Sequence, residues 1–134
     1  MQREELLDVV EQFDEVRLAY LFGSVAAGSA RPSSDLDVAV LLTPGAGRAV
    51  VDRLIDALER ASGRTVDLVD LLLAPPLLAH EVVKQGKLIF SRDEAERVEF
   101  ETRAVARYLD TAHLRKVQHE YLRERVEARG AAAR

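Results

Sequence analysis

The segment from residue 16 to residue 42 constrains the fold most, because two short apolar runs lie there on either side of a stretch of small residues. The first run is VRLAYLF at 16–22, which stops at Gly23, and the second run occupies 35–42. Apolar runs of this length with turn residues at their ends are typical of strands that are buried on at least one face. The residues between them are mostly Gly, Ala, Ser and Pro, which suit a tight turn and one or two helical turns. We therefore expect two strands joined by a segment whose backbone closely approaches another group.

Helical and strand-like patterns alternate along the rest of the chain. Apolar residues at helical spacing predict helices over 2–13, 48–61 and 75–85, and a long charged helical region from 92 to about 129. Two further strands are expected over 65–71 and 87–90. This order predicts an α/β or α+β fold in which a small mixed sheet of about four strands is flanked by helices. We expect one domain over 1–134, with a body of sheet and helices over 1–91 and a C-terminal helical region over 92–134.

The C-terminal helical region allows two interpretations. Its apolar residues Val98, Val105 and Leu109 are expected to pack back on the sheet of the same chain. The residues beyond about 113, HLRKVQHEYLRERVEAR, either continue this packing or extend from the body. In the second case they would hold a partner, or a second copy of the chain in a homodimer.

Composition and charge exclude several classes of protein. The chain has no cysteine, which excludes thiolate zinc sites, iron–sulfur clusters, redox pairs and cysteine nucleophiles. Its first residues, MQREELLDVVEQF, carry acidic side chains within the apolar pattern, unlike a signal peptide, and no apolar stretch is long enough to span a membrane. The net charge of −4 disfavours direct binding to a nucleic-acid backbone. We expect a cytoplasmic protein that binds neither membranes nor nucleic acid.

Three aspartates are expected near one end of the sheet. Asp35 and Asp37 begin the second strand, and because side chains alternate along a strand, both lie on the same face, roughly 6 to 7 Å apart. Like charges this close repel each other unless they reach open solvent or hold a cation between them. Asp67 lies in the apolar run TVDLVDL, where no basic residue on either strand can pair with it, and Asp70 is a lesser candidate for the same role. Carboxylate oxygens in this arrangement suit a hard cation such as Mg²⁺.

The spacing of the glycine, serine and aspartate residues forms a long and specific motif. In GSVAAGSARPSSDLDVAV, ten residues separate Gly-Ser from Asp-x-Asp, and this pattern resembles the polymerase-beta-type nucleotidyltransferase superfamily, most closely its minimal nucleotidyltransferase (MNT) branch. TVDLVDL is similar to the strand that carries that family's third carboxylate, and LLAHEVVKQGKLIF to the helix and strand that follow it. ARYLDTAHLRK is similar to the tail of its antitoxin members. The resemblance therefore covers most of the chain and implies a polymerase-beta-like nucleotidyltransferase fold.

The resemblance implies which residues bind the nucleotide. Gly23 and Ser24 would hold the triphosphate of ATP, and Ser34 would also belong to the nucleotide site. Many family members carry Arg immediately before the second glycine, where this chain has Ala27. A cation that faces the phosphates is therefore missing at that position, and we expect Arg31 or an arginine of a partner to replace it.

The same resemblance implies roles for the aspartates. Asp35 and Asp37 would ligate two Mg²⁺ ions, and Asp67 would ligate the catalytic ion and help to deprotonate the attacking hydroxyl. All three would therefore be both catalytic and metal-binding residues. The reaction would be an in-line attack on the α-phosphorus of ATP, with pyrophosphate as the leaving group.

The acceptor of the nucleotide is expected to come from another protein. A chain of 134 residues has little room for an acceptor domain beside the catalytic sheet. The chain resembles the antitoxin half of pairs with a HEPN-domain ribonuclease toxin, which implies transfer of AMP to a toxin tyrosine within a hetero-oligomer. Two alternatives stay open: an antitoxin that acts by binding alone, and a small-molecule nucleotidyltransferase akin to antibiotic-modifying enzymes. The intact aspartate cluster disfavours the first, and the lack of room for an acceptor domain disfavours the second.

Overall fold

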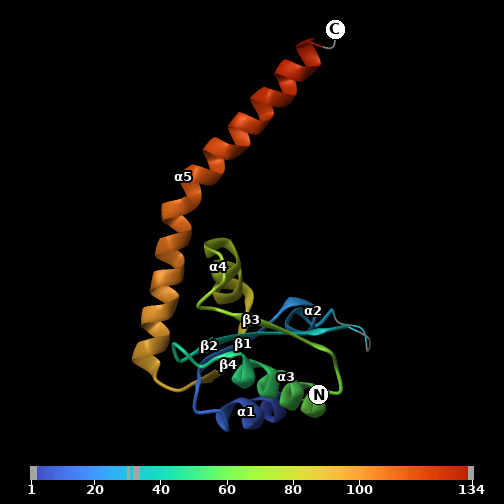
Figure 1. The fold of residues 1–134 in the computed structure, drawn as a ribbon, viewed down its shortest axis with the longest axis vertical. Helices are drawn as coiled ribbons and strands as arrows, with labels where there is room; N and C mark the ends of the chain where they lie inside the picture. Colours follow the sequence, from blue (N-terminus) through green and yellow to red (C-terminus); the bar gives the residue numbers. More distant parts are fainter. Residues whose placement is uncertain (1–2, 30, 32–33, 133–134) are drawn as a thin grey trace.

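The computed structural model describes residues 3–29, 31 and 34–132, and its elements follow the expected order. The helices are α1 (Arg3–Glu11), α2 (Gly23–Ala27), α3 (Arg48–Ser62), α4 (Pro76–Gln85) and α5 (Glu94–Ala132). The strands are β1 (Val16–Phe22), β2 (Leu36–Leu42), β3 (Val66–Asp70) and β4 (Lys87–Ser91). Each expected helix and strand is present, with ends that differ from the predicted ones by no more than a few residues (Figure 1).

The four strands form one mixed sheet in the order β3-β2-β1-β4. β1 pairs antiparallel with both β2 and β4, whereas β2 and β3 are parallel because α3 carries the chain back across one face of the sheet. The expected mixed sheet flanked by helices is therefore confirmed. This pairing brings the end of β1 together with the starts of β2, β3 and β4, and this end of the sheet carries the candidate site.

Helices cover both faces of the sheet (Figure 1). Leu36, Val38 and Val40 of β2 lie in a core with α1 and α3, while Ala39 and Leu41 lie in a second core with α4 and the first part of α5. This alternation is the one predicted from the sequence of β2. It places the side chain of each odd-numbered residue of β2 on the face covered by α4.

Helix α5 contacts the body through a different face from the one predicted. Val98 and Leu109 are 50% and 63% exposed, and Val105 is also exposed, so the expectation that these three pack on the sheet is wrong. Ala104, which is 4% exposed, faces the body instead. The polar pairs between β1 and α5, Arg17 with Glu96 and Tyr20 with Glu101, set this rotation of the helix.

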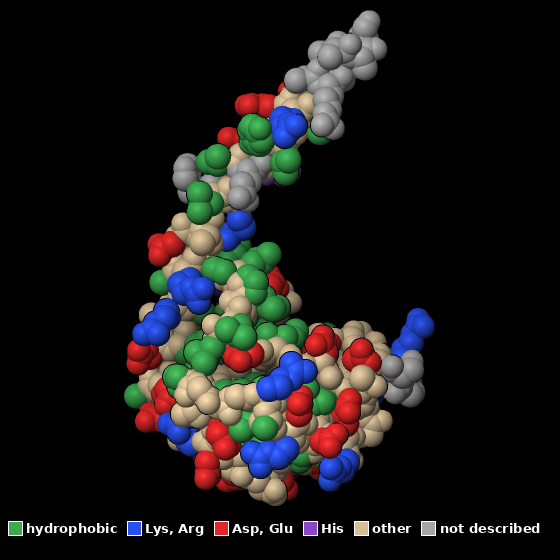
Figure 2. All heavy atoms as spheres, viewed as in Figure 1, with side chains coloured by type: hydrophobic (Ala, Val, Ile, Leu, Met, Phe, Trp, Pro, Cys, Tyr) green, Lys and Arg blue, Asp and Glu red, His purple; other side chains and the backbone are tan. Residues whose placement is uncertain are grey.

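Beyond about residue 113, α5 leaves the body and extends away from it (Figure 1). Of the two predicted alternatives for this part of the helix, extension from the body is therefore confirmed, and continued packing on the sheet is not. Hydrophobic side chains are spread along this half of the helix (Figure 2). The exposed ones are Leu114, Val117, Tyr121, Leu122 and Val126. Across the part of the chain that the structure describes, no helix is both long and apolar enough to cross a membrane.

Candidate active site

Three carboxylates gather where β2 and β3 begin. Asp37 of β2 lies directly beside Asp67 of β3 in the parallel pairing, and beside Phe22 of β1 on its other side. Asp35 precedes β2 by one residue and shares the face of Asp37 because the two are separated by one position. The structure therefore brings together the three aspartates predicted from the sequence, at the end of the sheet where β2 and β3 begin and on the face that α4 covers.

Burial and repulsion act together on the pKa of Asp37. Burial of the half-buried Asp37 raises the pKa of its carboxyl above the ordinary value, and the neighbouring charges of Asp67 and then Asp35 raise it further. Within residues 3–29, 31 and 34–132, no arginine or lysine forms an ion pair with any of the three. Negative charge is thus concentrated at one end of the sheet with no compensating cation from the described side chains.

Asp70 lies apart from this cluster. It is three residues from Asp67 on β3, so its side chain lies on the opposite face of the sheet. There its carboxylate accepts a hydrogen bond from the backbone N–H of Leu72, at 2.9 Å, and borders a hollow with Leu68 on the α3 side. Asp70 therefore shapes the turn after β3, and Asp67 is the carboxylate that faces Asp37.

Gly23 brings the backbone of the turn after β1 against Asp37. Its φ of +73° lies in the left-handed region, which strains any residue with a side chain. A Cβ atom at this position would lie 2.1 Å from Oδ2 of Asp37, far inside van der Waals contact. Only glycine allows the backbone to come this close to Asp37. The group that the backbone of this segment was predicted to approach is therefore the carboxylate of Asp37. Ser24 follows directly in α2.

A pocket of about 430 Å³ adjoins this turn. The residues that line it are Gly23, Ser24, Ala27, Ser29 and Gln85. Ala27 thus borders the pocket, and no charged side chain of the described residues lines it. Gln85 was not predicted from the sequence, because only the pairing of β4 with β1 reveals that the end of α4 lies here.

Ser34 is placed elsewhere. Its hydroxyl accepts a hydrogen bond from the backbone N–H of Arg31, at 2.8 Å, and so stabilises the turn before β2. Arg64, which precedes β3, donates hydrogen bonds to the carbonyl oxygens of Arg31 and Ser34, at 2.8 and 2.9 Å. Ser34 does not line the pocket beside Ser24, and the guanidinium of Arg31 does not line it either. The segment that leads to Asp35 is instead held against the start of β3.

The donor atoms of the cluster suit a hard divalent cation, although they do not enclose one. Among the described residues, no three His, Asp or Glu side chains are arranged closely enough to form a metal site by themselves. Asp37 and Asp67 nevertheless offer adjacent carboxylates on one face, and these are ligands that Mg²⁺ prefers. An ion bound here would need further oxygen ligands, which a bound nucleotide supplies through its phosphates.

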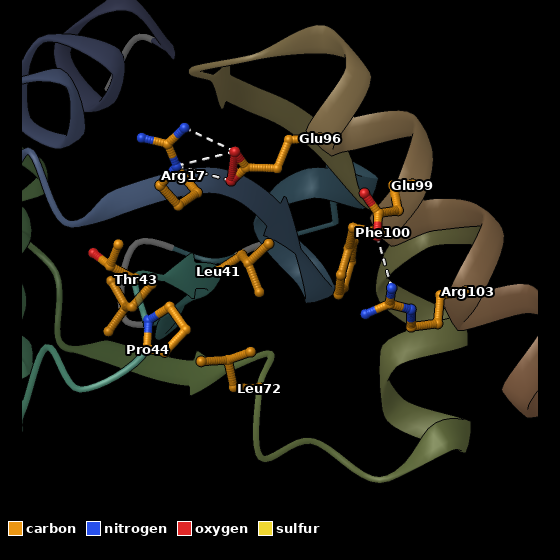
Figure 3. A pocket seen from close by; sticks show the side chains of 10 residues that line it. Arg17, Leu41, Thr43, Pro44, Leu72, Glu96, Glu99, Phe100 and Arg103 are labelled. Atoms are coloured by element: carbon orange, nitrogen blue, oxygen red, sulfur yellow. Dashed lines mark hydrogen bonds and ion pairs between the residues drawn. The ribbon is translucent and has the colours of Figure 1, made fainter.

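A second cavity, of about 360 Å³, lies at the other end of β2 and is shown in Figure 3. Its wall is largely apolar, with Leu41, Leu72 and Phe100 among the lining residues. The charged residues at its rim are paired with each other, as Arg17 is with Glu96 (Figure 3). These paired groups leave no reactive cluster there, and the carboxylate end of the sheet is the candidate active site.

The chain is similar to proteins of one known family. The family described as "Polymerase beta, Nucleotidyltransferase" matches residues 4–95 of the chain. The chain is 32% identical over 98 residues to the protein adenylyltransferase MntA of Shewanella oneidensis, a match that covers 73% of this chain and 70% of that protein.

Solved structures with the same fold include two toxin–antitoxin complexes. A chain of a toxin–antitoxin complex with AMP-PNP superposes with a TM-score of 0.79 and 26% identity, covering 91% of this chain and 98% of that one. A chain from a complex of the tri-AMPylated Shewanella oneidensis HEPN toxin with an MNT antitoxin gives a TM-score of 0.72 and 25% identity, covering 90% and 94%.

Proposed function

The chain belongs to the polymerase beta nucleotidyltransferase family and is a nucleotidyltransferase, and we propose that it transfers AMP from ATP to a tyrosine hydroxyl of a HEPN-domain toxin in a Mg²⁺-dependent reaction. It would act as the antitoxin of that toxin. The observation that carries the proposal is the placement of Asp37 beside Asp67, with the backbone of Gly23 against the Asp37 carboxylate.

The chemistry follows from where these groups lie. The acceptor oxygen forms a bond to the α-phosphorus while the bond from that phosphorus to the bridging oxygen breaks, and pyrophosphate leaves with the electron pair. Asp67, at the exposed edge of the cluster, accepts the proton of the attacking hydroxyl. Mg²⁺ ions held by Asp35, Asp37 and Asp67 would make that hydroxyl more acidic and neutralise charge on the leaving group.

Gly23 and Ser24 would hold the triphosphate beside this cluster. The proposal rests on the close approach of Gly23 to Asp37, which fixes the distance between the phosphate-binding turn and the carboxylates. Ser24 offers a hydroxyl that lines the pocket and can donate to a phosphate oxygen. The distance between donor and carboxylate is set by rigid backbone, which favours a reaction that depends on positioning.

The relatives support the choice of donor and acceptor. MntA is a protein adenylyltransferase, and the complexes contain AMP-PNP in one case and an AMPylated HEPN toxin in the other. AMP on a toxin tyrosine would add negative charge and bulk where RNA phosphates bind, which would block the ribonuclease. The extended half of α5, with its exposed apolar side chains, offers a surface for such a partner or for a second copy of the chain.

The test compares two identical substitutions on opposite faces of the sheet. Asp37→Asn removes a carboxylate of the cluster, whereas Asp70→Asn changes a carboxylate on the α3 side and keeps an acceptor for the Leu72 N–H. Each variant is incubated with ATP, Mg²⁺ and the proposed HEPN-domain partner, and the mass of that partner is measured. We expect adenylylated HEPN protein with the parent and with Asp70→Asn, and none with Asp37→Asn.

The same assay separates the alternatives. If the parent binds and inhibits the HEPN protein but adds no AMP, the chain is an antitoxin that acts by binding alone. If Asp37→Asn transfers AMP at the parent rate, the carboxylate cluster is not the catalytic site. Transfer to small hydroxyl compounds, with none to the HEPN protein, would indicate a small-molecule nucleotidyltransferase.

A further inference from the structure

Gln85 lines the same pocket as the Gly-Ser turn. Of the described residues that line this pocket of about 430 Å³, it is the one that comes from outside 23–29. The others are Gly, Ser or Ala, so Gln85 provides the longest side chain in the pocket and its one amide group. An amide carries two N–H donors and a carbonyl acceptor and bears no charge.

The position of Gln85 is fixed by the end of α4. Gly86 follows it, and β4 then begins with Lys87 paired to Leu21, two residues before Gly23. A Cβ atom on Gly86 would lie 2.3 Å from the carbonyl oxygen of Val82 and 3.4 Å from that of Leu21. The first distance reflects the close end of α4 on itself, and the second is an ordinary van der Waals contact with the end of β1. This contact and the pairing of Lys87 with Leu21 place Gln85 beside the Gly-Ser turn.

The strand order indicates which part of a nucleotide reaches Gln85. Reading across the sheet, Asp67 and Asp37 lie on β3 and β2, Gly23 follows β1, and Gln85 precedes β4. In the proposed function the α-phosphorus reacts at the carboxylates, so the β- and γ-phosphates extend over Gly23 toward β4. The small lining residues of the pocket give a base no aromatic or broad apolar surface on which to stack, whereas they leave room for a phosphate.

We propose that Gln85 binds the terminal phosphate of the nucleoside triphosphate, as a neutral donor in a pocket that small uncharged residues otherwise line. This inference rests on the proposed function, because it takes the orientation of the nucleotide from it. The amide Nε2–H donates to a γ-phosphate oxygen, and the exposed side chain is free to reach it. Gln85 would thus distinguish triphosphates from nucleotides that lack the terminal phosphate.

The test measures binding of ATP and of AMP by calorimetry in the presence of Mg²⁺. Gln85→Ala is expected to weaken ATP binding about tenfold and to leave AMP binding unchanged, because one charge-assisted hydrogen bond to the γ-phosphate is lost. Gln85→Glu should weaken ATP binding further by repulsion, and Gln85→Arg should strengthen it. Gln12→Ala is the matched control, since Gln12 is an exposed glutamine in the turn after α1, away from the pocket.

The outcomes separate this inference from the function on which it rests. Equal weakening of ATP and AMP by Gln85→Ala would place Gln85 against the nucleoside and overturn the inference. If the parent binds ATP and transfers AMP, and Gln85→Ala binds ATP as tightly as the parent does, the inference is overturned while the proposed function stands. A parent protein that binds no ATP would refute both. Equal midpoints of thermal unfolding for the parent and its variants show that each binding change is local.

Discussion

Replacement of Gly23 by alanine tests whether the turn after β1 positions the carboxylate cluster. Two effects are expected from one methyl group. The backbone at φ +73° costs a residue with a Cβ atom about 1 to 2 kcal/mol of folding free energy. In addition, the new Cβ would lie 2.1 Å from Oδ2 of Asp37, so the carboxylate or the turn must move by roughly 1 Å or more.

The displacement, and not the loss of stability, is expected to dominate the effect on activity. Misplacement of a catalytic group by roughly 1 Å reduces a rate by about 100-fold. The expected phenotype of Gly23→Ala is therefore a folded protein, less stable by about 1 to 2 kcal/mol, that transfers AMP about 100-fold more slowly than the parent. The free energy of unfolding is measured by urea denaturation and the transfer rate with ATP labelled at the α-phosphate.

Gly45→Ala is the matched control for backbone strain. Gly45 has a φ of +82°, lies beyond the opposite end of β2, and has no atom within 4 Å of the position that a Cβ would take. It should lose a similar amount of stability and keep the parent rate of transfer. The reasoning is refuted if Gly23→Ala transfers at the parent rate, or if the two variants lose transfer to the same extent.

Three further predictions concern the stability of the protein. Because the pKa of Asp37 is raised in the folded state, the stability that this carboxyl contributes is full below its ordinary pKa near 3.8 and is lost as pH rises through its folded-state pKa. Asp37→Asn should therefore raise the melting temperature of the metal-free protein at pH 7. A difference in melting temperature that persists at pH 3 would contradict this. Tyr20→Phe removes the 2.7 Å hydrogen bond to Glu101 and should cost about 1 to 2 kcal/mol in urea denaturation; a cost below about 0.5 kcal/mol would show that the bond does not hold α5. Ala104→Glu should cost about 3 kcal/mol or more, and Val105→Glu less than about 0.5 kcal/mol, because only Ala104 faces the body; equal costs would place the contact face of α5 elsewhere.

The strands and the faces of the carboxylates were predictable because they depend on local periodicity. The limits of β1 agree with the apolar run at 16–22, and the alternation along β2 correctly assigned Asp37 and Val38 to opposite faces. The separation of Asp67 from Asp70 follows from the same alternation, since three positions along a strand reverse the face.

Features that depend on contacts between distant segments were not predictable. The face of α5 that meets the body is set by Arg17 and Tyr20 of β1, which bind Glu96 and Glu101. The apolar pattern of the helix instead favoured Val98, Val105 and Leu109. Gln85 lies beside the Gly-Ser turn because β4 pairs with β1, and nothing in the local sequence indicates that pairing. The parallel pairing of β2 with β3 likewise depends on the path of α3.

The most direct test of the proposed function uses ATP labelled at two different phosphates. The protein is incubated with its HEPN partner and Mg²⁺, in one reaction with label at the α-phosphate and in another with label at the γ-phosphate, and a third reaction contains excess EDTA. We predict that the HEPN protein retains the α-label on a tyrosine, that the γ-label is released with pyrophosphate, and that EDTA abolishes transfer. Retention of the γ-label by the HEPN protein, or transfer that persists in EDTA, would contradict the account.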